Sequence, residues 1–347
     1  MNELLPEAIC WQRVQVTSPE LLESVAVVAA RGLVFVGGGN RLQTLNLYLP
    51  ATEENLKLVG KTAERLPQAS AGSHGIKHQV HVHGGAWRDP HLSASSIEPQ
   101  VALAFREPID ALLAGICSIN YTLAKFPDHP DDPYDPWLNH YADPAREGKH
   151  PQQVADVMLG LVFLRSIGLE DHAYILSAHS CGSCIALQVV LQPPLFYGLP
   201  ETYTPPCPAA IVSLNGLYDL PDLIHCQDAA HEHLSEEYRT MLQNVFGEDE
   251  DGWAVLSPTR FESEGLIVRA QQSLIPPLFF ASGSGLDQLV SLNQIEKLEQ
   301  SLREVKGVSF VRATRSVGYH AMPWETGTAL WQSVQDAMAL LPLEAKA

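Results

Sequence analysis

Short apolar runs alternate along the chain with segments of helical spacing. One helical segment spans residues 151–167, where Val154, Val157, Met158, Leu161 and Leu164 share one face. A second amphipathic segment runs over residues 324–341. The runs that predict strands are 25–36, 44–49, 78–83, 115–121, 174–177, 209–215, 277–282 and 308–313. Strands that alternate with helices predict a mostly parallel sheet with helices on both faces, the α/β class.

Three further regions complete this outline. Residues 25–36 and 44–49 predict an antiparallel pair joined by the turn Gly37–Asn40, and residues 109–114 predict the end of a helix. Between Asp219 and Pro276 the pattern is helical or irregular, without strand character. We therefore expect residues 1–347 to form one domain, with a cap inserted between late strands at about residues 220–275.

Composition and net charge exclude some classes of binding partner. The 347 residues are 46% hydrophobic, enough for a substantial core, and carry a formal net charge of −18. This charge argues against nucleic acid or an anionic membrane as partner. The N-terminal residues lack a basic region followed by an apolar stretch, so no signal peptide is predicted, and no run is long enough to span a bilayer. We expect a cytoplasmic protein, alone or as a homodimer; the net charge says little about a small-molecule substrate, because the local charge at a site can differ from the total.

The segment Tyr174–Gln188 has the pattern of a strand, a tight turn and a helix, with Ser180 at the apex. It matches the G-x-S-x-G nucleophile elbow except that Ala178 replaces the first glycine. Taken alone, Ser180 could instead be an ordinary helix N-cap. In the elbow interpretation, the serine hydroxyl stands at the N-terminus of a helix, where backbone amides favour developing negative charge.

A serine nucleophile requires a base and an acid that orients the base. In the α/β chain order both follow the serine, which predicts His320, in the loop after the last strand, as the base. Asp287 follows the strand that ends at Ser282, and Asp219 follows the preceding strand. Position favours Asp287 as the acid, with Asp219 as the alternative and as a candidate for ordering the cap.

The loop His83–Trp87 follows a predicted strand upstream of the serine and contains two glycines. We expect the backbone amides of Gly85 and Ala86, together with that of Cys181, to form an oxyanion hole. His81 and His83 are expected to anchor this loop, and His179 is expected to pack in the interior. A redox pair of Cys181 with Cys184 is a weaker interpretation than two small residues that pack the turn.

No cofactor and no metal is expected. The segment Asp128–Pro136 is acidic, but its prolines hinder the chain from wrapping an ion, which favours a solvated loop. His231 and His233 lie two residues apart and would point to different faces of a helix.

Together, His83–Trp87 with the adjoining Arg88–Pro90, the Ser180 elbow, Asp287 in Leu286–Val290 and His320 in Gly318–Met322 resemble the fungal-type kynurenine formamidases of the α/β-hydrolase superfamily. The resemblance covers the catalytic strands from about His78 to Trp324, in the correct order. It implies hydrolysis of N-formyl-L-kynurenine to L-kynurenine and formate. The bulky aromatic leaving group implies an aromatic lining, for which the candidates are Trp87, Tyr121, Tyr218 and Trp324.

Two other classes of protein share parts of this sequence pattern. A carboxylesterase of the hormone-sensitive-lipase-like kind carries the same two-glycine loop and elbow, and would tolerate longer acyl chains than a formamidase. A catalytically inactive hydrolase fold could instead act as a receptor, but such proteins usually lack a member of the triad. All three candidate triad residues are present here in order.

Overall fold

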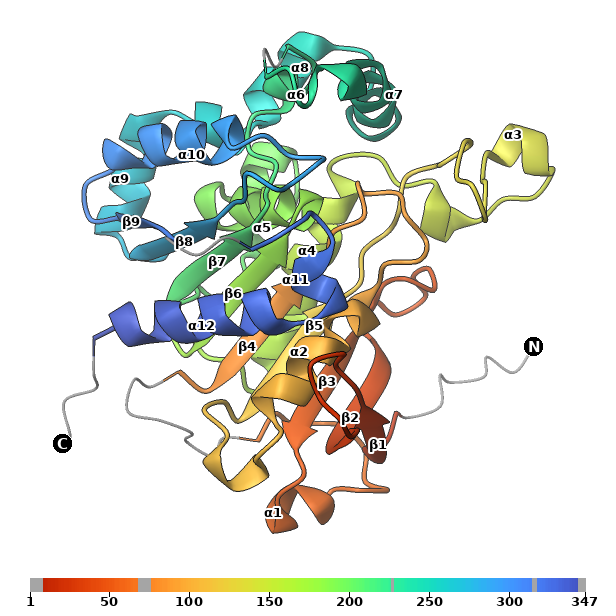
Figure 1. Ribbon diagram of the computed structural model, residues 1–347, viewed down its shortest axis with the longest axis vertical. Coiled ribbons are helices and arrows are strands. Elements are labelled where there is room, and N and C mark those ends of the chain that lie inside the picture. Colours follow the sequence, from red (N-terminus) through yellow and green to blue (C-terminus); the bar gives the residue numbers. More distant parts are fainter. Residues whose placement is uncertain (1–8, 68–75, 226–227, 314–316, 343–347) are drawn as a thin grey trace.

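The computed structural model describes residues 9–67, 76–225, 228–313 and 317–342. The ends of the predicted domain, residues 1–8 and 343–347, and positions 226–227 of the predicted cap lie outside these residues. Within the described ranges, helices and strands alternate as the sequence predicts (Figure 1). No helix there has the length and apolar character needed to cross a membrane.

A nine-stranded sheet forms the centre of the molecule, in the order β1-β2-β3-β5-β4-β6-β7-β8-β9. Its first three strands pair antiparallel with their neighbours, and every pairing from β5 to β9 is parallel. The strands are β1 Gln12–Val16, β2 Val25–Val34, β3 Thr44–Pro50, β4 His78–Val82, β5 Gly115–Ile119, β6 Tyr174–His179, β7 Ala210–Leu214, β8 Leu278–Ser282 and β9 Ser309–Arg312. The predicted mostly parallel α/β fold is confirmed.

Helices cover both faces of the sheet (Figure 1). One hydrophobic core lies between the sheet and α4, α5 and α10, and a second lies between the opposite face and α2 and α12. The helices are α1 Glu53–Leu56, α2 Glu98–Ala104, α3 Pro136–Asn139, α4 Gln152–Ser166, α5 Cys181–Leu191, α6 Leu220–His225, α7 Ser235–Phe246, α8 Glu250–Leu256, α9 Ser263–Gln271, α10 Asn293–Arg303, α11 Met322–Glu325 and α12 Thr328–Leu340. Every residue of β4, β5, β6, β7 and β8 is buried, as expected for strands covered on both faces.

The prediction that a helix ends at residues 109–114 is wrong. Helix α2 ends earlier, and only one 3₁₀ turn, Pro108–Asp110, precedes β5. Ile109 and Leu112 are exposed, so the apolar residues that suggested a helix do not pack on the sheet. Pro108 also lacks the amide hydrogen that a continuing helix would need.

Helices α6 to α9 lie between β7 and β8 and occupy most of the segment expected to form a cap. In Figure 1, α6, α7 and α8 lie above the end of the sheet where β6 and β7 finish. The described part of this segment contains no strand.

The turn between β6 and α5 is held tightly against the neighbouring strand. A Cβ atom on Gly182 would lie 2.3 Å from the carbonyl oxygen of His83 and 2.4 Å from that of Val82. Both obstacles are backbone atoms, which cannot rotate away. Ala178, by contrast, is an ordinary buried residue of β6, so the missing first glycine of the elbow leaves the turn intact.

We therefore expect Gly182→Ala to destabilise the protein by about 3 kcal/mol or more, at or above the upper end of the usual cost of overpacking. Urea unfolding would measure this change. Gly265→Ala is the matched control, because Gly265 lies in α9 with no atom within 4 Å of the added methyl. It should stabilise α9 by up to about 1 kcal/mol. A Gly182→Ala protein as stable as the unmodified chain would show that the contact between turn and strand is looser than described.

Candidate active site

Ser180 lies at the apex of the turn between β6 and α5, with φ 54° and ψ −128°. A non-glycine residue in this region is strained, as the nucleophile elbow requires. The amide of Ser180 donates to the carbonyl of Leu214 in β7 (3.0 Å), which fixes the turn to the sheet. The Ser180 side chain lines a cavity and is only 5% exposed as a residue.

His320 and Asp287 approach Ser180 from two later loops. His320 follows β9, and its Nε2 lies 2.9 Å from the Oγ of Ser180. Its Nδ1 lies 2.9 Å from Oδ2 and 3.1 Å from Oδ1 of Asp287, which follows β8. With Nδ1–H donating to the carboxylate, Nε2 is free to accept the serine proton. Hydroxyl, imidazole and carboxylate thus form one hydrogen-bonded chain that can activate the serine.

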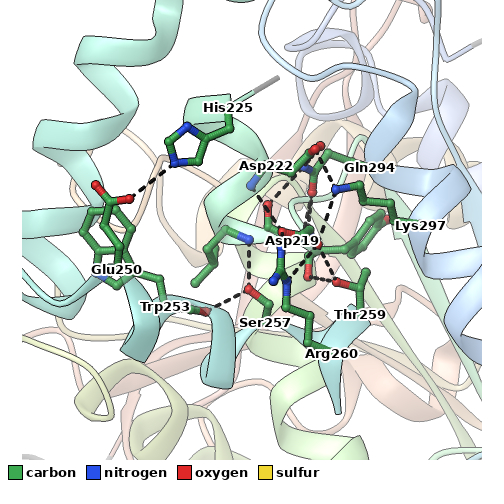
Figure 2. A network of polar contacts seen from close by, with 12 residues as sticks. Asp219, Asp222, His225, Glu250, Trp253, Ser257, Thr259, Arg260, Gln294 and Lys297 are labelled. Atoms are coloured by element: carbon green, nitrogen blue, oxygen red, sulfur yellow. Dashed lines mark hydrogen bonds and ion pairs between the residues drawn. The ribbon is translucent and has the colours of Figure 1, made fainter. Parts of the chain in front are cut away.

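Asp219, the alternative acid, is bound elsewhere. Figure 2 shows its carboxylate held by Arg260, whose Nη2 and Nε donate at 2.9 and 3.1 Å, with Lys297 Nζ 3.5 Å away. Asp219 is buried, and although burial opposes its charge, Arg260 and Lys297 lower its pKa. Its Oδ1 also accepts from the amide of Asp222 at the start of α6. Asp219 therefore joins the start of the α6–α9 segment to α10 and does not contact His320.

Two side chains that sequence reasoning left without a specific role support the loops of the triad. His179 Nε2 donates to the carbonyl of His320 (2.9 Å), and burial holds the pKa of this histidine well below its usual value. His231 Nε2 donates to the carbonyl of Asp287 (3.0 Å), while its Nδ1 pairs with Asp228 Oδ2 (2.9 Å). Both contacts join residues far apart in sequence, 141 and 56 positions respectively, so no local pattern could reveal them.

We expect His231→Gln to lower kcat about two- to tenfold, the value of one lost hydrogen bond that positions the Asp287 loop. KM should change little, because His231 does not line the cavity. Steady-state kinetics against His233→Gln, an exposed neighbour, would separate this effect from a general effect of the segment. Equal kinetics for the two variants would contradict the positioning role.

The loop His83–Trp87 adopts an unusual backbone that only strong local contacts can hold. Gly85, Ala86 and Trp87 have φ values of 103°, 51° and 59°. The Tyr121 hydroxyl donates to the carbonyls of His83 (3.0 Å) and Gly84 (2.9 Å), and the Trp87 amide donates to the Sγ of Cys181 (3.1 Å). The His83 ring stacks on Tyr121 with centroids 4.4 Å apart.

Gly85 and Ala86 line the same cavity as Ser180, and the oxyanion hole formed by their amides stays a prediction. Cys181 is the first residue of α5, so its amide has no partner within the helix. The Cys181 side chain supports the loop His83–Trp87, because its buried sulfur also lies 3.6 Å from the Tyr121 hydroxyl. Cys181 and Cys184 are both free, so they form no disulfide here.

The cavity has a volume of about 310 Å³, at the lower end of the range for small-molecule sites. Its wall includes Leu234, Glu237, Tyr238 and Met241, from α7 and the turn before it. The described part of the α6–α9 segment therefore helps to enclose the triad. A hollow of about 680 Å³ lies beside Asn40 and Asp143, but none of the triad residues lines it.

Of the four aromatic residues predicted to bind substrate, only Trp324 lines the cavity. Trp87, Tyr121 and Tyr218 are 1%, 0% and 1% exposed, and the prediction is wrong for them. Tyr121 supports the loop described above. The Tyr218 hydroxyl pairs with that of Ser213 (2.5 Å), and Trp87 packs edge-on against Phe246 of α7. The hydroxyl groups of Tyr121 and Tyr218 are therefore used inside the protein, as is usual for buried Tyr.

Three side chains near the cavity, Asp89, His91 and His129, lie close enough together to suggest a metal site. His129 Nδ1, however, accepts from the amides of Asp131 (3.2 Å) and Asp132 (2.9 Å). Nε2 of a neutral His129 must then carry the proton, which leaves no lone pair for a metal. The arrangement fits a hydrogen-bonded turn better than a metal centre.

Comparisons with known proteins identify similar chains. The chain is 27% identical over 310 residues to the kynurenine formamidase-like hydrolase fscH of Fusarium equiseti, covering 87% of this chain and 91% of that protein. It is 30% identical over 200 residues to kynurenine formamidase avaC of Aspergillus versicolor, covering 54% and 63%. It is 22% identical over 247 residues to kynurenine formamidase of Meyerozyma guilliermondii, covering 70% and 76%. No protein-family model matches the chain.

Solved structures support the fold. Esterase B of Lactobacillus rhamnosis, in an inhibited form, aligns with a TM-score of 0.60 at 15% identity over 90% of this chain and 87% of that one. A truncated carbohydrate esterase from gut microbiota aligns with a TM-score of 0.54 at 14% identity, covering 90% and 96%. At these identities the likeness establishes a common α/β-hydrolase architecture.

Proposed function

We propose that this chain, which has an α/β-hydrolase fold and is similar to kynurenine formamidases, hydrolyses N-formyl-L-kynurenine to L-kynurenine and formate. The observation that carries the proposal is the hydrogen-bonded chain Ser180–His320–Asp287 at the wall of a cavity. A linear formamide requires what this arrangement supplies, namely an activated hydroxyl and a proton donor for the departing nitrogen.

In the first half of the reaction, Ser180 Oγ attacks the formyl carbon while His320 Nε2 takes the hydroxyl proton. The amides of Gly85, Ala86 and Cys181 are the candidates to stabilise the negative charge that develops on the formyl oxygen. Asp287 keeps the ring oriented and stabilises its positive charge. As the C–N bond breaks, His320 returns the proton to the aniline nitrogen and kynurenine leaves.

In the second half, water attacks the formyl ester on Ser180. His320 takes a proton from the water and then returns it to Oγ as formate departs, which regenerates the hydroxyl. We propose that the segment 220–275 acts as a cap during both halves, since its α7 side chains line the cavity. A cytoplasmic setting and a homodimer stay predictions.

The test is incubation of the purified chain with N-formylkynurenine while kynurenine absorbance is followed. A panel of aryl esters with formyl, acetyl and butyryl groups serves as comparison. A formamidase should cleave the formamide and lose activity steeply as the acyl chain lengthens. Absence of formamide cleavage, together with efficient butyryl ester cleavage, would reject the proposal in favour of an esterase.

A further inference from the structure

Arg88 lies directly after the loop His83–Trp87, and its role is not explained by the triad chemistry. Its side chain is only 5% exposed and lines the cavity that contains Ser180. The guanidinium lies over the ring of Phe126, with Cζ 3.8 Å from the ring centroid. Nη2 donates to Oε1 of Glu237 at 3.2 Å, and the buried Nε has no partner among the described residues.

A second arginine shows how well a buried guanidinium can be paired in this protein. Arg146 has a side chain 4% exposed and lies over Tyr134, as Arg88 lies over Phe126. The Nε of Arg146 is also without a partner among the described residues, but Arg146 reaches both the carboxylate (2.9 Å) and the carbonyl (2.7 Å) of Asp132, and it lies outside the cavity. Among the described residues, Arg88 donates a hydrogen bond to one carboxylate, that of Glu237, whose own side chain is 64% exposed, while Asp89 and Asp128 act on it only through their charge.

A buried cation is costly unless acceptors surround it. A guanidinium offers five N–H donors in a planar fork that suits a carboxylate. Arg88 uses one donor in the contacts described, so an anionic group that entered the cavity would complete its pairing. The cavity wall beside it also carries the carboxylates of Glu237 and Asp89, which favour a positive group next to that anion. The rest of the wall is largely apolar, including Leu217, Met241 and Val290.

We propose that Arg88 binds the α-carboxylate and Glu237 the α-ammonium of the substrate, so that the site selects zwitterionic α-amino acids that carry a formamide at their far end. This proposal rests on the proposed function and adds the residues that recognise the amino-acid group. On binding, the substrate carboxylate would take the place of Glu237 at the guanidinium, and Glu237 would turn to the ammonium. Each of the two protein charges would then face an opposite charge on the substrate.

The experiment compares kcat/KM for four formamides: N-formylkynurenine, its analogue without the amino group, its analogue without the carboxylate, and a 2-formamidophenyl alkyl ketone with neither group. The unmodified enzyme should prefer the zwitterion over the neutral ketone at least about tenfold, the value of one charge-assisted hydrogen bond. Arg88→Gln should lose about 10- to 100-fold on the two substrates that carry a carboxylate. Its activity on the other two should stay within about threefold of that of the unmodified enzyme.

Glu237→Gln should affect recognition of the substrate ammonium. We expect a loss of about two- to fivefold on the two substrates with an ammonium, as for a partly exposed ion pair. The carboxylate-only substrate should be cleaved as well as before or better, since Arg88 no longer has a competing partner. Arg146→Gln is the control, because it removes a similarly buried, ring-stacked guanidinium outside the cavity, and the ratios among the four substrates should not change.

A uniform loss on all four substrates in Arg88→Gln would indicate a structural role and overturn the proposal, as would unchanged ratios. If Arg88→Gln does not fold, Arg88→Lys tests the same ratios with the charge kept and the planar fork removed, and the same selective loss is expected on a smaller scale. An unmodified enzyme that cleaves N-formylkynurenine and the neutral ketone equally well would refute the recognition site alone. An unmodified enzyme that cleaves neither would refute the proposed function as well.

Discussion

Ser180→Ala should abolish formamide hydrolysis, with kcat/KM about 10⁴- to 10⁶-fold lower, the range found when a serine hydrolase loses its nucleophile. The reason is geometric. His320 Nε2 lies 2.9 Å from Oγ, and without the hydroxyl no group at the elbow can form the formyl ester. Kynurenine release would be followed by absorbance, and a fluorophosphonate should label the unmodified chain but not the variant.

Ser183→Ala is the matched control for this substitution. Ser183 lies in the first turn of α5 and is fully buried, but it does not line the cavity. Its removal should leave both turnover and labelling close to those of the unmodified chain. Residual turnover by Ser180→Ala within tenfold of the unmodified rate would contradict a covalent serine mechanism. Near-UV circular dichroism of both variants would check that the fold is kept.

The parts of this site that the sequence predicts are those encoded in short local segments. The elbow, the two-glycine loop and His320 each follow a strand, and parallel strands bring their carboxyl ends to one edge of the sheet. The structure accordingly brings Ser180, His320 and Asp287 together. Asp219 and Asp287 each follow a strand and position favoured Asp287; in the structure Asp287 contacts His320, while Asp219 contacts Arg260 and Lys297.

Features that depend on side-chain orientation could not be predicted from the sequence. Tyr121 and Tyr218 could have faced substrate, but both bury their hydroxyl groups in contacts with the protein. Strand β1 escaped prediction because Gln12–Val16 is polar and mostly exposed at the edge of the sheet. Recognition of Arg88 as a cavity residue likewise required the position of α7, which supplies its partner Glu237.

The protein should lose stability steeply on acidification, because several histidines are buried in their neutral form. Burial lowers the pKa of His81 to about 3, and burial also lowers the pKa values of His78 and His83 to about 4. All three belong to β4 or the residue after it, at the centre of the sheet. In the unfolded chain the same groups titrate near pH 6.5.

Between about pH 6.5 and pH 4 the unfolded chain therefore binds more protons than the folded protein, and the free energy of unfolding falls as the pH falls. Each such histidine contributes a slope of up to about 1.4 kcal/mol per pH unit. Three of them give about 4 kcal/mol per pH unit, a large part of the stability of an ordinary domain. Urea unfolding measured at intervals from pH 7.5 to pH 5 should reveal this slope.

Two substitutions would test whether His81 contributes to the dependence of the free energy of unfolding on pH. His81→Gln removes one titrating group and should reduce the slope by about 1.4 kcal/mol per pH unit, whatever its effect on stability at pH 7.5. Ser177→Ala removes the hydroxyl 3.0 Å from Nδ1 of His81 but keeps the imidazole, so the slope should persist. If both variants kept the full slope, the acid sensitivity would originate outside His81, and the charge state assigned to this buried strand would be wrong.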